Sequence, residues 1–320
     1  MGKLKNVVVN LIFYFFFVIL CLILLNLYFS LFGLRNFRNI YLSGNNYNLR
    51  YMLKPKSVTI VEGVVYKINS FGFRDKELNS DYVKDRKYRI LCVGDSITFG
   101  EGVSTNKTYP KLLEKELRSK FSKNIEVLNA GVPGYNTYDE LLYIKNYLIK
   151  LSPDMIILGF FMENDSEDPS LEFNNKMSSN KDELVDLFYY LKEAERKKKL
   201  HNTGFWQKYR DSIWDPDSDQ WKRCVDSLIS INSLAKEHNI ELLVLIIPMY
   251  DNEQDKFLTQ LVSVLNEANI KYVNPFPELK KSKHINPRPF VTENHPDERM
   301  HEIYTKTLLS AFDENKLKLN

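Results

Sequence analysis

A serine and a histidine, each placed just beyond a predicted strand or turn, could together carry out acyl transfer. Ser96 follows the apolar run 90–93 and lies in Gly94-Asp95-Ser96, where a buried parallel strand would end and a helix begin. His295 lies near the other end of the chain, in the stretch 294–296. A nucleophilic serine needs a base that takes its proton, and histidine suits that role. The alternative is that Asp95 and Ser96 only cap the next helix.

Donors for an oxyanion could come from two further strand ends. The stretch 129–131 would offer the backbone N–H of Gly131, and the stretch 163–165 would offer the side-chain amide of Asn164. The backbone N–H of Ser96 would be a third donor, because N–H groups at a helix start have no partner within the helix. These residue types are the ones that an acyl-enzyme mechanism requires.

An alternation of strands and helices is expected to position these residues. Strands are predicted at 89–93, 125–128, 155–159, 241–247 and 271–273, and helices at 109–121, 138–151, 221–238, 253–268 and 297–312. The pattern predicts an α/β protein, a three-layer α/β/α sandwich with a mostly parallel central sheet of about five strands. Ligands would bind beyond the carboxyl ends of the strands. An insertion at about 166–219, with a helix at 181–199, interrupts the pattern, and 275–288 is predicted to be a loop.

Four blocks in this order resemble the SGNH hydrolase family, also called GDSL-type esterases. GDSITFG at 94–100 is similar to the nucleophile block, NAGVPG at 129–134 to the glycine-donor block, MEND at 162–165 to the G-x-N-D block, and NHPDERMH at 294–301 to the histidine block. The stretches NSFGFRDKE and ILGFF-x-x-ND are similar to a membrane-anchored bacterial branch. The resemblance covers about 67–315. It implies a flavodoxin-like fold, an ester hydrolase with Ser96, His295 and an orienting acid, and no metal or organic cofactor.

The chain departs from this pattern at two positions. Met162 stands where the family usually has glycine, and the residue three before the histidine is Thr292 rather than an acid. Glu293, two residues before His295, is the candidate acid that would orient the imidazole. Asp297 is expected to cap the last helix instead, and His301 is expected to be structural or on the surface.

The first part of the chain has the composition of a membrane anchor. Residues 7–33 contain no charged side chain, and roughly 20 apolar residues suffice to cross a bilayer. No small-residue cleavage site follows, which argues against a signal peptide. We expect a single-pass anchor with a cytoplasmic N-terminus and a periplasmic or extracellular catalytic domain. Residues 34–66 would form a stalk and edge strands, including a hairpin at 58–66, and 67–320 the hydrolase-like domain.

The charge and the cysteine count limit the classes of partner that the chain could bind. The net charge of +3 argues against nucleic acid as a main partner. The three cysteines form neither a disulfide framework nor a metal-ligand spacing. The expected substrate is an extracytoplasmic ester, such as an O-acyl group of cell-envelope polysaccharide or a lipid. An O-acyltransferase that uses the same residues, and a non-catalytic glycan-binding or assembly protein, are the alternatives.

Overall fold

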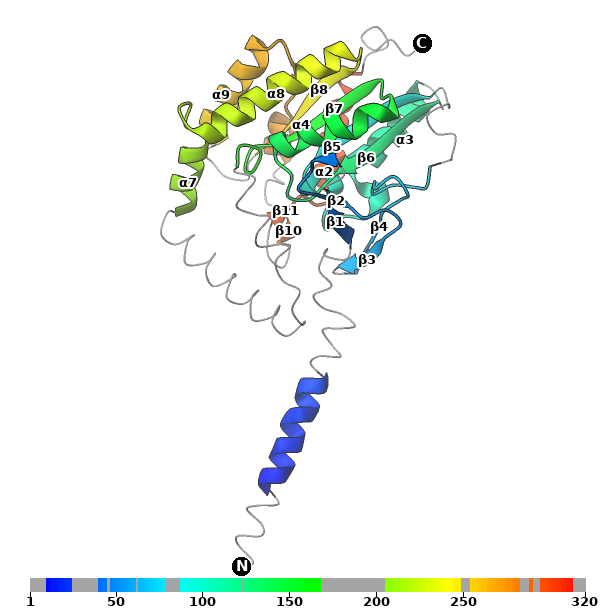
Figure 1. Cartoon of the computed structure of the whole chain (residues 1–320), viewed down its shortest axis with the longest axis vertical. Helices are drawn as coiled ribbons and strands as arrows, with labels where there is room; N and C mark the ends of the chain where they lie inside the picture. The colour runs from blue at the N-terminus through cyan, green and yellow to red at the C-terminus, as the bar shows by residue number, and fades with distance from the viewer. Residues whose placement is uncertain are drawn as a thin grey trace, which may run out of the picture.

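A five-stranded parallel sheet forms the centre of the protein (Figure 1). The computed structural model describes residues 10–24, 40–44, 47–61, 63–78, 87–121, 124–167, 205–248, 254–282, 288–289 and 294–312. In chain order the strands are β5 (Tyr88–Gly94), β6 (Ile125–Gly131), β7 (Met155–Phe161), β8 (Glu241–Ile247) and β9 (Lys271–Val273). Their spatial order, β6-β5-β7-β8-β9, is the flavodoxin-like one and confirms the predicted α/β sheet. The four longer strands are buried almost throughout, as expected for a sheet covered on both faces.

Helices form a layer on each face of the sheet. Apolar residues of one face share a core with α4 (Thr137–Asn146), α8 (Asp219–Glu237) and α9 (Gln254–Glu267). Those of the other face share a core with α3 (Tyr109–Lys120), α10 (Phe276–Ser282) and α11 (Glu298–Leu309). Strand residues alternate between the two cores because successive side chains point to opposite faces. The shorter helices are α2 (Ser96–Phe99), η3 (Thr105–Lys107), η4 (Leu148–Leu151) and α7 (Phe205–Ile213).

Two predicted segments on the helical layers differ from the structure. The helix predicted at 138–151 is divided at Tyr147 into α4 and η4. The prediction of a loop at 275–288 is wrong for its first half, which forms α10. Asn274 starts this helix by accepting a hydrogen bond from the backbone N–H of Phe276 at 3.0 Å. Leu279 then anchors it in the core, with 2% of its surface exposed.

Within the segment 34–66, which was predicted to hold a stalk and edge strands, the described residues 40–44 and 47–56 pack onto the domain. Here β1 (Tyr41–Ser43) and β2 (Tyr51–Leu53) form an antiparallel pair. The side chain of Tyr51 is buried, and its hydroxyl donates to the carbonyl of Pro133 at 2.8 Å. Arg50 pairs with Asp139 at the start of α4. The described residues of this segment therefore contact the domain that contains the central sheet.

The hairpin predicted at 58–66 is present as β3 (Val58–Val61) and β4 (Val64–Lys67). It forms a separate two-stranded sheet and does not join the edge of the central one. Its inward residues, Thr59 and Tyr66, are buried. Tyr66 stacks on Phe99 of α2, with 5.5 Å between ring centroids, so the hairpin supports the segment that follows Ser96.

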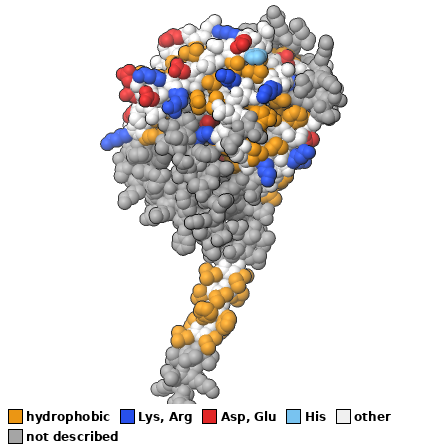
Figure 2. All heavy atoms as spheres, viewed as in Figure 1, with side chains coloured by type: hydrophobic (Ala, Val, Ile, Leu, Met, Phe, Trp, Pro, Cys, Tyr) orange, Lys and Arg blue, Asp and Glu red, His pale blue; other side chains and the backbone are white. Residues whose placement is uncertain are grey.

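Residues 10–24 form a helix whose apolar side chains are exposed (Figure 2). Within the described ranges, no helix is both long and apolar enough to cross a membrane. The predicted anchor covers 7–33, and its residues 7–9 and 25–33 lie outside the described part of the chain, as does the helix predicted at 181–199.

Candidate active site

Ser96 and His295 meet at the carboxyl edge of the sheet. Ser96 is the first residue of α2, directly after β5. His295 lies in β11 (Asn294–His295), which pairs with β10 (Arg288–Pro289). The Ser96 Oγ and the His295 Nε2 are 2.9 Å apart, although the residues are separated by 199 positions. His295 is 6% exposed. The geometry is that of a hydroxyl beside a base able to take its proton.

Three glycines allow α2 to lie directly on the ends of the central strands. Gly94, Gly131 and Gly159 are register partners on β5, β6 and β7. A Cβ atom at Gly94 or Gly159 would come within 2.1 or 2.5 Å of Thr98 Oγ1, and one at Gly131 within 2.3 Å of the Phe99 nitrogen. Real Cβ atoms do not approach so closely, so these positions need glycine. The glycines thereby place Ser96 over the point where the strand order reverses.

Asn164 is held beside Ser96 by the turn after β7. The backbone N–H groups of Asn164 and Asp165 both donate to the carbonyl of Phe161. The Asn164 Nδ2 donates to Asp95 Oδ2 at 3.0 Å. An amide nitrogen carries two hydrogens, so one remains for a ligand. Asp95 also caps α2 by accepting from the backbone N–H of Ile97, which confirms the capping interpretation for Asp95, and the catalytic interpretation of Ser96 stays a prediction.

Met162, which stands where the family usually has glycine, is accommodated in the core. Its side chain is fully buried in the core. Its backbone N–H donates to Ile247 at 3.1 Å, and its carbonyl accepts from Trp214 Nε1 at 3.2 Å. Trp214 is itself 1% exposed, so it packs in the core. The turn into Asn164 is therefore anchored by backbone bonds and needs no glycine at position 162.

The glycine donor is less simple than the sequence suggested. The N–H of Gly131 donates to Asn129 Oδ1 at 3.1 Å. Three residues later, Tyr135 N–H donates to Val132 at 3.1 Å and closes a turn in which Gly134 has a φ of +81°. Within the described residues, no hydrogen bond is recorded for the N–H of Gly134. Gly134 follows proline in this turn, a position that the sequence analysis did not single out.

The structure describes Asp297 and His301 but not Glu293, the candidate acid. Glu293 lies outside the described residues, so its role stays a prediction. Asp297 caps α11 by accepting from the backbone N–H groups of Arg299 and Met300, as expected. His301 is fully buried, and its Nδ1 accepts from the backbone N–H of Tyr109 at 3.2 Å. Burial lowers the pKa of His301 to about 3, so it is a neutral structural residue.

A group of buried carboxyls beneath the site was not anticipated from the sequence. Asp95, Asp165 and Glu140 of α4 are all fully or almost fully buried. Asp165 accepts hydrogen bonds from Thr137 Oγ1 at 2.9 Å and from the Phe161 N–H. Burial raises the pKa of each of the three carboxyls, and for Glu140 the negative charges of Asp165 and Asp95 add to the effect. Burial and the neighbouring carboxyls therefore favour the neutral form of Glu140. No spacing in the sequence connects α4 to the strand ends.

Because of this burial, Glu140→Gln is expected to stabilise the fold increasingly as pH rises. Unfolded Glu140 loses its proton near its ordinary pKa, whereas the folded group keeps it, so wild-type stability falls as pH rises through this window. Glutamine has nearly the same shape and does not titrate. Urea unfolding measures the free energy of unfolding of both proteins. The difference between the variant and the wild type should rise by at least about 1 kcal/mol in favour of the variant from about pH 5 to about pH 8. The exposed Glu237→Gln is the control, and a pH-independent difference would refute the neutral state of Glu140.

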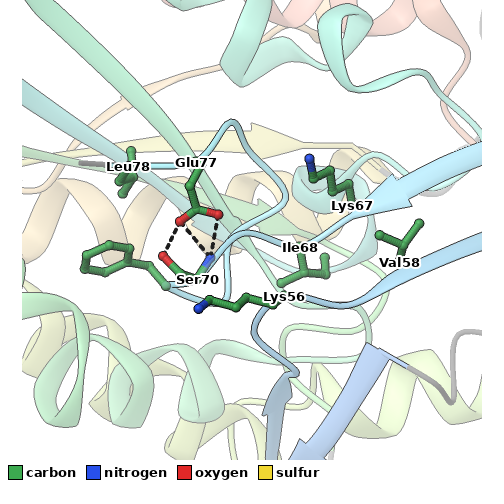
Figure 3. Close-up of a pocket in the computed structure, with 8 residues that line it drawn as sticks. Lys56, Val58, Lys67, Ile68, Ser70, Glu77 and Leu78 are labelled. Atoms are coloured by element: carbon green, nitrogen blue, oxygen red, sulfur yellow. Dashed lines mark hydrogen bonds between the residues drawn. The ribbon is translucent and has the colours of Figure 1, made fainter. Parts of the chain in front are cut away.

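A separate hollow lies between the β3–β4 hairpin and the segment that follows it (Figure 3). Its volume is about 490 Å³, and Lys56, Lys67, Ser70 and Glu77 are among its lining residues. The Glu77 carboxylate accepts hydrogen bonds from the backbone N–H and the hydroxyl of Ser70. None of the proposed catalytic residues lines it. The described residues also contain no cluster of side chains that could hold a metal ion.

The fold and the site define an α/β sandwich with a serine–histidine pair at its switch point. No family model matches the chain. A segment of 110 residues is 32% identical to an uncharacterized protein of Mycoplasma pneumoniae and covers 33% of this chain and 12% of that protein.

Several solved structures are similar to this chain at low identity. A lipolytic protein of the G-D-S-L family from Veillonella parvula is 17% identical, with a TM-score of 0.43 over 70% of this chain and 97% of that one. A variant of an acetyl-xylooligosaccharide esterase from Geobacillus is 15% identical, with a TM-score of 0.46 over 71% and 95%. A two-domain esterase active on acetylated mannans is 13% identical, with a TM-score of 0.44 over 72% and 50%, so this chain spans half of its length.

Proposed function

We propose that this chain is a serine ester hydrolase that works through an acyl-enzyme on Ser96. The observation that carries the proposal is the 2.9 Å approach of Ser96 Oγ to His295 Nε2. The two side chains lie at the carboxyl edge of the parallel sheet, at the point where the strand order reverses, and folds of this class bind ligands there. The four sequence blocks supply these residues and the Asn164 amide.

In the proposed reaction, Ser96 Oγ attacks the ester carbonyl carbon while its proton moves to His295 Nε2. The carbon–oxygen bond to the alcohol then breaks, and His295 returns the proton to the departing alcohol oxygen. Water repeats the sequence on the acyl-enzyme, giving up one proton to His295, and the serine hydroxyl is regenerated as the acid leaves. Glu293 is proposed to orient the imidazole through its Nδ1.

The oxyanion is proposed to bind the Ser96 N–H, the free hydrogen of the Asn164 amide and a glycine N–H. Gly131 was the first candidate for that glycine, and its N–H would have to leave Asn129 to serve. We propose that Gly134, in the adjacent turn, supplies the donor instead. Fixed donors of this kind stabilise charge that develops only in the transition state.

Covalent labelling of the serine tests this function directly. A fluorophosphonate probe should label the wild-type chain and the exposed Ser104→Ala control equally, because only an activated serine reacts with it. Ser96→Ala should remove the label. Failure to label the wild type would favour a non-catalytic protein that keeps the fold, and labelling that survives Ser96→Ala would place the nucleophile elsewhere.

We also propose that residues 7–33 anchor the protein in a membrane and that the ester is extracytoplasmic. The exposed apolar side chains of the helix at 10–24 support the anchor. An O-acyl group of cell-envelope carbohydrate is the proposed substrate class. Alkaline carbonate extraction of expressing cells should leave the full chain in the membrane pellet, and release into the supernatant would contradict the anchor.

A further inference from the structure

A second carboxylate lies beside the reacting atoms of the site. Glu101 follows α2, and its Oε2 is 3.4 Å from His295 Nε2. This is the same ring nitrogen that faces Ser96 Oγ. An acid that orients a catalytic histidine bonds to the other nitrogen, Nδ1. Glu101 therefore occupies the side of the imidazole where the proton is handed to the departing alcohol.

Hydrogen bonds from Arg74 hold the backbone turn that contains Glu101. The buried Arg74 guanidinium donates to the carbonyls of Phe99 at 2.9 Å, Gly100 at 2.5 Å and Val103 at 2.6 Å. These carbonyls lie before and after Glu101 in the turn. Arg74 also lies 4.2 Å from the ring centroid of Tyr66.

The hydroxyl of Tyr66 accepts a hydrogen bond from the Gly102 N–H at 2.8 Å. The residues on both sides of Glu101, Gly100 and Gly102, have φ values of +86° and +78°, which glycine adopts without strain. The β3–β4 hairpin and Arg74 thus hold the turn in one conformation. A turn held in this way presents the Glu101 side chain from a fixed backbone position beside His295.

A positively charged group lies near Glu101. Burial lowers the pKa of Arg74 to about 10, and the nearby Tyr66 and Glu101 oppose that shift. Arg74 is therefore charged at neutral pH, and it donates hydrogen bonds to backbone carbonyls on both sides of Glu101. The side chain of Glu101 is 13% exposed, which is low enough to weaken screening by water.

We propose that Glu101 selects the substrate by the charge of its alcohol portion, favouring esters of cationic alcohols and rejecting esters of anionic ones. The inference rests on the proposed esterase function and adds the chemical class of the group that leaves. A fixed negative charge a few ångströms from the departing oxygen attracts a cation and repels an anion bound there. At an effective dielectric of about 20 the two effects together amount to at least about tenfold in relative kcat/KM.

A matched series of aryl acetates tests the proposal on the full chain in neutral detergent. The esters are 3-acetoxy-N,N,N-trimethylanilinium, phenyl acetate and 3-acetoxybenzoate, which carry a positive, a zero and a negative charge. The ratio of kcat/KM for the cation to that for the anion should fall by at least about tenfold in Glu101→Gln. Comparing this ratio between wild type and variant cancels the different intrinsic reactivities of the esters. Glu302→Gln, an exposed carboxylate of α11, should leave the ratio unchanged.

The outcomes separate this inference from the function on which it rests. An unchanged ratio in Glu101→Gln, with Ser96-dependent hydrolysis of phenyl acetate, would overturn the selectivity and leave the esterase standing. An equal loss on all three esters would assign Glu101 a structural role or a general effect on the histidine and would also overturn it. Absence of Ser96-dependent hydrolysis in the wild type would overturn both.

Discussion

Replacing Ser96 by alanine is expected to lower kcat/KM for phenyl acetate by about 10³-fold or more, with little change in stability. The hydroxyl is the proposed nucleophile, and it forms a hydrogen bond with His295. Removing it deletes the covalent step and leaves the surrounding turn intact. The measurement is steady-state hydrolysis, with thermal unfolding of each variant as the test of folding.

The losses of activity from replacing Ser96 and from replacing His295 should not be additive. His295→Ala alone should cost about as much as Ser96→Ala, because a hydroxyl without its base is a poor nucleophile. The double variant should then be no slower than either single one. His238, which caps the end of α8 and is exposed, provides the matched control as His238→Ala. Losses that multiply in the double variant would show that the two side chains serve different steps.

Gly131→Ala is expected to destabilise the fold by about 3 kcal/mol or more, or to prevent folding. The new Cβ would lie 2.3 Å from the Phe99 nitrogen and 2.7 Å from the Thr98 carbonyl carbon, both backbone atoms of α2. The helix cannot move away easily, because the Phe99 carbonyl also accepts from Arg74 and from Asn129 Nδ2. Urea unfolding measures the loss, and the rate of fluorophosphonate labelling reports whether any folded protein keeps Ser96 in place.

Gly63→Ala in the β3–β4 turn separates the steric cause from the conformational one. Gly63 has a φ of +78°, but no atom lies within 4 Å of a Cβ built there. Alanine at this position should cost only about 1–2 kcal/mol, the price of a left-handed backbone. If Gly131→Ala were no more harmful than Gly63→Ala, the close approach of α2 to the sheet would not be the reason for glycine.

Local patterns were enough to predict the sheet and most of its helices. The apolar runs of β5, β7 and β8 are unbroken because both faces of the strand are buried, and such runs can be recognised from the sequence alone. Segments that owe their order to distant partners were missed. No contact to the domain was predicted for Arg50 and Tyr51, yet they bond to Asp139 and Pro133, more than eighty positions away.

For the site, the sequence by itself determined which residue types could do chemistry. Ser96 and Asn164 each follow an apolar strand, and parallel strands bring their carboxyl ends to one edge of a sheet, so their proximity was predictable. That His295 would join them followed from a resemblance in its block of residues. Only the tertiary structure decided the rest, because chain spacing does not encode a distance across the fold. It brought Glu101 to the imidazole, Glu140 beneath the strand ends and the Gly131 N–H onto Asn129.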